Sequence, residues 1–149
     1  MSLEKKIMEA IKTAMKEKNQ QALAALRAVK SELILLKTSG SLSELNETDE
    51  KKILQKLVKQ RKDSASIFSE QNREDLAIPE LEQAEIILRF LPKQMSENEV
   101  EIVVAEIISK TGANSMKDMG KVMGLTNSQL AGKADGKTIS GIVKKMLSN

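Results

Sequence analysis

Apolar residues recur every three or four positions along almost the whole chain of 149 residues, which is the spacing of one face of an α-helix. The stretch from Leu3 to Met15 has an apolar residue at every fourth position, and the stretch from Leu23 to Leu36 advances in steps of three and four. No segment shows the two-residue alternation of a β-strand. The sequence therefore predicts an all-α protein, with a multihelical body over residues 1–92 and a small three-helix tail domain over residues 93–149.

Turn and capping residues divide this pattern into separate helices. A break near Asn19 separates the first two, and TSGSLSELNE (residues 38–47) predicts a loop. We expect Thr48 to cap the third helix and Asn72 to end it in the left-handed conformation. Pro79 is expected in the first turn of a fourth helix, where its missing N–H costs no hydrogen bond.

The body and the tail are expected to separate between Pro92 and Ser96. A proline disfavours helical backbone in the residue before it, so a helix should end here. Ser96 with Glu99 three positions later is the signature of a capping box, which opens the next helix. Ser115 with Asp118 repeats the signature and predicts a further helix start.

Residues that carry much of enzyme chemistry are missing from the sequence. It contains no His and no Cys, which excludes the usual zinc sites, cysteine nucleophiles and Ser-His-Asp relays. Phe68 and Phe90 are the only aromatic residues, so there is no aromatic platform on which RNA bases could stack. The sequence accordingly predicts no catalytic residue, no metal site and no cofactor.

The apolar runs are also too short to cross a bilayer, and the N-terminal stretch carries charges throughout. We expect no membrane partner and a cytoplasmic location, with which the absence of cysteine agrees.

Positive charge is concentrated near the C-terminus. Residues 110–149 contain seven lysines and two aspartates, whereas the whole chain has a formal net charge of only +3. The rest of the chain is therefore slightly negative. A basic tail on a nearly neutral body favours contact with polyanions.

The segment GKADGKT (residues 132–138) resembles the end of a phosphate-binding P-loop, but its spacing is wrong. A P-loop has five steps between its two glycines and follows a buried strand. Here Gly132 and Gly136 are four apart, and the preceding residues do not predict a strand. A helix–helix corner, capped by Asp135, fits better. The lysines at positions 133 and 137 would then either be solvated or assist anion binding at a helix N-terminus.

The same region resembles a known family. GANSMKDMGKVMG (112–124) followed by GKADGK (132–137) is similar to the YqeY-like family and to the tail of the B subunit of the tRNA-dependent amidotransferase, the GatB/YqeY domain. KQRKDS (59–64), NREDL (72–76) and LPKQMSE (91–97) agree in order and spacing, so that the similarity spans nearly the whole chain from about Lys12.

This resemblance implies a helical body and a three-helix tail that engages tRNA. It also implies kinship with a carbon–nitrogen ligase that uses glutamine as amido-N-donor, but no catalytic residues match. Two positions depart from the family pattern. LTNSQLA (125–131) replaces an apolar stretch that often contains proline, and Lys133 stands where arginine, with its two-pronged grip on phosphate, is common.

Arg61 lies on the same helical stripe as the apolar residues Leu54, Val58 and Phe68. An unpaired charge on that face would be costly, so we expect either a structural ion pair or a ligand site at the seam between body and tail. Met116, Met119 and Met123 suit a core or a surface that adapts to a partner. Gly120 and Gly124 are expected to allow close helix packing.

Three functions fit the sequence. The first is an accessory tRNA-binding module, non-catalytic by itself, with phosphates contacted by Lys121, Lys133, Lys137 and Lys144. The second is a protein–protein adaptor that docks through its tail on a translation enzyme, such as an aminoacyl-tRNA synthetase or the amidotransferase. An enzyme in its own right is the third, although the residue types it would need are largely missing.

Overall fold

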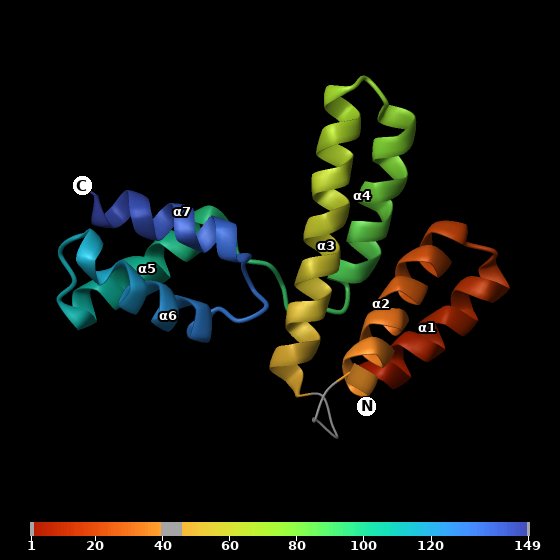
Figure 1. Ribbon diagram of the computed structural model, residues 1–149, viewed down its shortest axis with the longest axis horizontal. Helices are drawn as coiled ribbons and strands as arrows, with labels where there is room; N and C mark the ends of the chain where they lie inside the picture. The colour runs from red at the N-terminus through yellow and green to blue at the C-terminus, as the bar shows by residue number, and fades with distance from the viewer. Residues whose placement is uncertain (1, 40–45, 149) are drawn as a thin grey trace. The chain divides into compact units, whose positions relative to one another are not determined.

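The computed structural model describes residues 2–39 and 46–148, and in these ranges the protein is all-α (Figure 1). It contains seven α-helices and one short 3₁₀ turn, with no strand among the described residues. The prediction of an all-α fold is confirmed. None of the described helices is both long enough and apolar enough to span a membrane.

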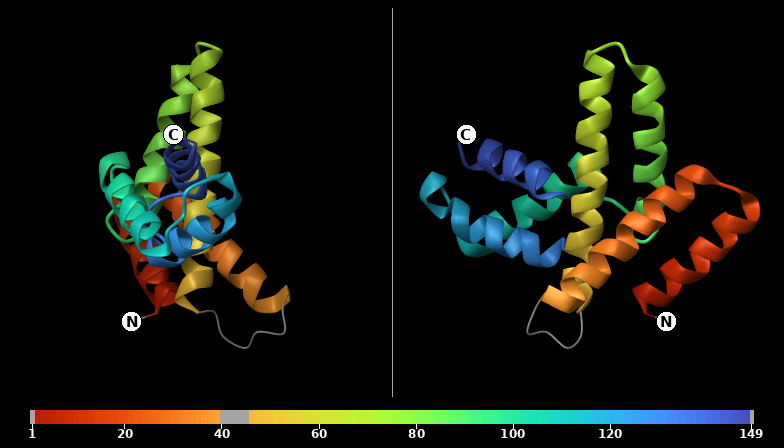
Figure 2. Two further views of the ribbon diagram at one scale, coloured as in Figure 1. Left: turned by 90° about the vertical axis from the view of Figure 1, so that its left-hand side faces the viewer. Right: turned by 45° about the vertical axis from the view of Figure 1, so that its right-hand side comes forward.

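The chain divides into two compact units, Met1–Pro92 and Lys93–Asn149, here called the body unit and the tail unit. The body unit consists of α1 (Leu3–Glu17), α2 (Gln20–Ser39), α3 (Glu47–Glu70) and α4 (Glu74–Leu88). Helices α1 and α2 pack as one pair and α3 and α4 as another, and α2 joins the pairs by contacting both α3 and α4. Figures 1 and 2 show α3 and α4 side by side as an antiparallel hairpin.

Buried aliphatic side chains from all four helices form the core of the body unit. Ile7 of α1, Val29 of α2, Leu54 of α3 and Ile87 of α4 are the most completely enclosed. Met15 is 56% exposed although it continues the four-residue steps that begin at Leu3. Four residues turn a helix by about 40° more than a full circle, so three such steps rotate a side chain by about 120°, away from the core.

The breaks between the body helices use residues that tolerate unusual backbone angles. Lys18 (φ 56°) ends α1, and the side chain of Asn19 then accepts a 3.0 Å hydrogen bond from the amide of Ala22 at the start of α2. Asn72 adopts the predicted left-handed conformation, with φ 60°, between α3 and α4. Asparagine is enriched at positive φ because this conformation costs it less free energy than it costs most other side chains. Lys18 has no such advantage.

The loop between α2 and α3 differs from the prediction at both ends. Thr38 and Ser39 belong to α2, and α3 already begins at Glu47, so the described residues of the predicted loop are mostly helical. Residues 40–45 lie outside the described part of the chain. The cap of α3 is Asn46, which accepts a 2.8 Å hydrogen bond from the amide of Asp49, and not Thr48. Once Asn46 caps the helix, Thr48 lies inside the first turn.

Pro79 also lies elsewhere than predicted. Helix α4 begins at Glu74, so Pro79 is inside the helix instead of in its first turn. The start is shifted because Arg73 folds back on Asp75 through two hydrogen bonds of 3.0 Å, and acidic residues favour the positive end of a helix. Pro79 therefore removes one intrahelical hydrogen bond.

The tail unit contains α5 (Glu97–Thr111), the 3₁₀ turn η1 (Met116–Asp118), α6 (Met119–Gln129) and α7 (Gly136–Leu147). Its three α-helices all contact one another and enclose a separate apolar core. The predicted capping box is present, because the Ser96 hydroxyl accepts from the amide of Glu99 at 3.2 Å and the Glu99 carboxylate accepts from the amide of Ser96 at 3.4 Å.

Ser115 does not repeat this arrangement. Its side chain makes no capping hydrogen bond, and the residues after it form the 3₁₀ turn. The carboxylate of Asp118 instead accepts a 3.1 Å hydrogen bond from the amide of Asn114. The predicted helix cap at Ser115 was wrong. A serine followed three positions later by an aspartate can start a helix, but the aspartate can instead accept from the amide of the residue before the serine and so close a turn.

Candidate nucleic-acid interface

The GKADGKT segment forms a corner between α6 and α7. The Asp135 carboxylate caps α7 by accepting from the amide of Thr138 at 2.6 Å, and Gly132 adopts a positive φ of 78°. A helix and not a strand precedes the segment, so the architecture of a P-loop is absent from this described region. The predicted helix–helix corner is confirmed.

Backbone groups of the corner are held by the segment that enters the tail unit. The side-chain amide of Gln94 donates to the carbonyl of Gly132 at 2.8 Å, and the amide of Met95 donates to the carbonyl of Lys133 at 2.9 Å. Both bonds cross nearly forty residues of sequence, which is why local patterns did not reveal them. Lys133 thus combines an anchored backbone with an exposed side chain.

Helix α7 has one buried and one exposed face. Ile139, Ile142, Val143 and Leu147 are buried, whereas the exposed residues Lys137, Gly141, Lys144 and Ser148 follow one another at three- and four-residue spacing. We call this second set the α7 strip. Because its positions stack along one side of the helix, the two lysines project from the same face with small residues between and beyond them.

Lys145 has a different environment from its neighbour Lys144. Its amino group lies 3.5 Å from the Glu101 carboxylate of α5, which places it on the α5 side of α7. Lys144 is about 100° further round the helix. The ion pair partly offsets the charge of Lys145, whereas Lys144 takes part in none of the ion pairs among the described residues.

Lys121 lies on the exposed face of α6, between Gly120 and Gly124. A Cβ atom added at either glycine would meet nothing within 4 Å. The expectation that these glycines allow close helix packing is therefore wrong, since they face open space. Two exposed glycines within a helix lower its stability, yet they leave a low surface beside the Lys121 side chain.

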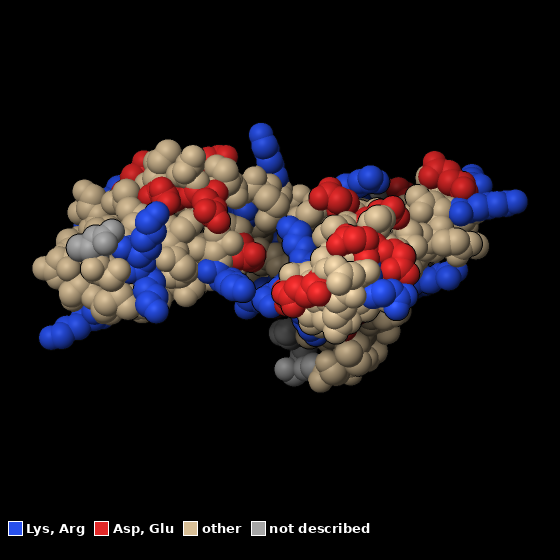
Figure 3. Space-filling view, turned by 90° about the horizontal axis from the view of Figure 1, so that it is seen from above, with Lys and Arg blue, Asp and Glu red and all other residues tan. Residues whose placement is uncertain are grey.

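The four lysines predicted to contact phosphates, Lys121, Lys133, Lys137 and Lys144, are all exposed. Two of them share the α7 strip; the other two lie on the corner and on α6, the elements that directly precede α7. A single groove lined by all four stays a prediction. In Figure 3, Lys side chains of the tail unit (left, blue) project singly or in small groups, with Asp and Glu groups (red) on the same unit.

The segment LTNSQLA, which departs from the family pattern, is part of the tail's architecture. Helix α6 includes the first five residues of this segment and ends at Gln129, and Thr126 is completely buried. The Thr126 hydroxyl donates to the carbonyl of Val122 at 2.8 Å, which satisfies the polar group inside the core. Leu130 is buried against the same core.

The methionines are divided between core and surface. Met119 and Met123 pack partly buried against the tail core, whereas Met116 is 42% exposed. Ile102 on α5 and Leu125 on α6 are exposed as well. The tail unit therefore offers apolar as well as basic surface.

Arg61 has an amide partner where a carboxylate was expected. Its Nε donates to the Gln83 side chain at 3.2 Å and its Nη1 to the carbonyl of Leu57 at 3.3 Å. Gln83 in turn donates to Gln21 at 2.8 Å, so the network joins α3, α4 and α2. Among the described residues Arg61 has no ion-pair partner, because the residues that α4 and α2 present to it are glutamines.

No group of three or more Asp and Glu residues in the described ranges is arranged to hold a metal ion.

The chain is similar to known proteins in two comparisons. The family model for Yqey-like protein matches residues 4–147. Altered inheritance of mitochondria protein 41, mitochondrial, of Clavispora lusitaniae is 30% identical over 124 residues, which are 81% of this chain and 72% of that protein.

Proposed function

Because this chain belongs to the YqeY-like protein family, we propose that it is an accessory module that binds structured RNA, with tRNA the favoured ligand. The tail unit would make the contact, and the module would be non-catalytic by itself. The observation that carries the proposal is the α7 strip, in which two exposed lysines share one face of a capped helix.

The α7 strip suits a phosphate backbone more than base edges. Lysine ammonium groups act as point charges on phosphates, and the tail unit contains no Arg and no aromatic residue for base recognition. Gly141 leaves room for a backbone to approach the helix between the two lysines, and Ser148 leaves room beyond Lys144. Recognition would then depend on RNA shape and charge, as is usual for double-stranded regions.

The energetics follow from the same contacts. Each lysine that neutralises a phosphate releases counterions, so affinity should fall steeply with salt. Losing one contact should lower the slope of log affinity against log salt by about 1. Three or four contacts without base readout give modest affinity.

A binding assay with tRNA at several salt concentrations tests the proposal. We expect replacement of Lys133, Lys137 and Lys144 together by Glu to abolish binding, with an unchanged helical CD spectrum because all three side chains are exposed. The matched control replaces Lys5, Lys12 and Lys16, which are exposed on α1, and should bind nearly as well as the wild type. Equal loss in both triple variants would indicate generic charge attraction, and no binding by the wild type at low salt would refute the RNA proposal.

An adaptor that docks on an aminoacyl-tRNA synthetase or amidotransferase is the second candidate. The exposed apolar residues of the tail unit favour it, with Ile102 62% and Met116 42% exposed. In that case Ile102→Glu should abolish capture of the protein partner while tRNA binding is unchanged. The cytoplasmic location inferred from the sequence stays a prediction, since the name of the fungal relative places that protein in mitochondria.

A further inference from the structure

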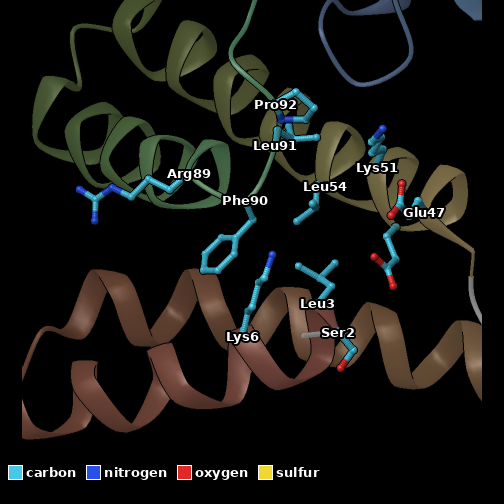
Figure 4. Close-up of a pocket in the computed structure, with 11 residues that line it drawn as sticks. Ser2, Leu3, Lys6, Glu47, Lys51, Leu54, Arg89, Phe90, Leu91 and Pro92 are labelled. Carbon is cyan, nitrogen blue, oxygen red and sulfur yellow. The ribbon is translucent and has the colours of Figure 1, made fainter.

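The body unit contains a cavity of about 500 Å³ that the tail-based proposal does not use (Figure 4). Its walls come from three elements: the start of α1, the first turns of α3 and the segment that follows α4. A cavity of this size is within the range of small-molecule sites.

One side of the cavity is apolar. Leu3, Leu54 and Leu91 are buried in the core and present side chains to it, and Phe90 is partly buried beside them. In Figure 4 the Phe90 ring extends from the segment after α4 toward α1. An apolar group placed against this wall would release water from both surfaces, which is favourable.

A positive charge projects into the same space. Figure 4 shows the Lys6 side chain rising from α1, with its amino group between Phe90 and Leu3, whereas the Arg89 guanidinium points away from the cavity. Within the described ranges Lys6 takes part in none of the ion pairs. A carboxylate entering the cavity would therefore find an accessible ammonium group.

Two carboxylates line the cavity on the α3 side. Burial is the main cause that raises the pKa of Glu50 above its usual range, the charge of Glu47 raises it further, and Lys6 offsets part of the effect. The two carboxylates thus repel each other in a partly desolvated place. A cationic group bound next to the carboxylates of Glu47 and Glu50 would relieve this repulsion.

We propose that this cavity binds a free α-amino acid with an apolar side chain. The carboxylate of the ligand lies on Lys6, its ammonium group on Glu47 and Glu50, and its side chain against Phe90 and Leu54. The lining carries both signs of charge, with Lys6 and Lys51 beside Glu47 and Glu50, so a simple anion or a simple cation would match only part of it. A zwitterion with an apolar body satisfies both charges and the apolar wall.

The test is a titration of the full ¹⁵N-labelled chain with L-leucine, L-methionine and L-phenylalanine, followed by NMR. For a ligand of this size we expect a Kd of about 1 mM or lower, with shifts at the amides of Leu54, Phe90 and Leu91. L-Leucinamide and N-acetyl-L-leucine each lack one charge and should bind at least about tenfold more weakly.

Two variants and two controls complete the experiment. Lys6→Gln and Glu50→Gln should each lower the affinity about tenfold or more. Lys12→Gln and Glu9→Gln, at exposed positions of α1 outside the cavity lining, should leave it unchanged. Absence of shifts at about 10 mM amino acid would overturn the proposal, and so would binding of either blocked derivative as tight as that of L-leucine. The titrations with the amino acids and with the two blocked derivatives use the wild-type chain, so their outcome does not depend on whether the variants fold.

Discussion

Individual charges in this protein differ in effect according to what surrounds them. Lys144 and Lys145 are adjacent in sequence, but Lys145 lies 3.5 Å from Glu101 whereas Lys144 projects from the α7 strip. Exposed ion pairs contribute little to stability, so the pairing of Lys145 matters chiefly for the charge available to a ligand. Counting lysines in the tail therefore overestimates the attraction that an RNA would experience.

Glu50 gives a prediction at this scale. Its raised pKa means that the folded protein binds the proton more tightly than the unfolded chain does. The corresponding stabilisation is fully present below the unfolded pKa of about 4.3 and is lost as pH rises through the folded pKa. The free energy of unfolding of Glu50→Gln minus that of the wild type should therefore be more positive at pH 7 than at pH 4, by under about 1 kcal/mol. Urea unfolding at the two pH values measures this.

Asp75 supplies a comparison of opposite sign. Its hydrogen bonds with Arg73 are the main cause that lowers the pKa of Asp75, so its stabilisation is present above the unfolded pKa and is lost as pH falls through the folded pKa. Asp75→Asn should lose stability near neutrality and little at low pH. If the two variants respond to pH in the same direction, the assignment of these charges is wrong.

Helices α6 and α7 of the tail unit contain three exposed glycines, which are expected to lower the stability of both helices. Gly120, Gly124 and Gly141 are helical and face open space, so an added methyl group would clash with nothing within 4 Å. Glycine lowers helix stability because it has more backbone freedom to lose on folding. If the RNA proposal holds, these glycines would leave a low surface for a nucleic-acid backbone.

Replacing each of these glycines by alanine separates stability from binding. Each variant should raise the free energy of unfolding by about 0.5–1 kcal/mol, as measured by urea denaturation. The variant at Gly141, within the α7 strip, should at the same time bind tRNA more weakly, because the methyl group raises the surface between the two lysines. Gly112→Ala is the control: its φ of +70° makes alanine strained, so this variant should be less stable. Stabilisation with unchanged tRNA binding would argue against contact at the strip.

Within residues 2–39 and 46–148 there are two apolar cores that share no residue, one in the body unit and one in the tail unit. Each core is built from helices of its own unit, and each unit is within the size range of small domains. The energetic consequence is that damage to one core should remain local. A ligand in the body cavity and an RNA on the tail would then act on separately folding parts.

Hydrogen exchange tests this independence. Val143→Ala removes a completely buried side chain from the tail core and should cost about 2 kcal/mol. Amides of α5, α6 and α7 should exchange faster by the corresponding factor, while those of α1 to α4 keep their protection. Ile87→Val is the matched variant in the body core and should lower the free energy of unfolding by about 1 kcal/mol. Amides of α1 to α4 should then exchange faster, while those of α5, α6 and α7 keep their protection. Equal loss of protection in both units would show that they unfold together.

How far local patterns predict this protein can be seen in its caps. The Ser96–Glu99 box, the Asp135 cap and the left-handed Asn72 were predicted, because each joins residues at most three apart and is decided by neighbouring side chains. Where two residues could cap the same helix, as with Asn46 and Thr48, local patterns did not choose correctly. Pro79 was misplaced for a similar reason, since the Arg73–Asp75 pair determines where α4 starts.

By itself the sequence determined the all-α class and most helix positions, because helical periodicity and capping act over a few residues, and its motifs determined the family. The four lysines of the candidate interface stay a prediction. Only the tertiary structure decided which groups meet across the chain. Arg61 finds Gln83 and Gln21, Gln94 holds the corner at Gly132, and Lys6 projects into a cavity whose other walls come from α3 and the end of α4. The physical reason is that such meetings depend on how packed helices cross, and burial of the whole core, not any local signal, sets those crossings.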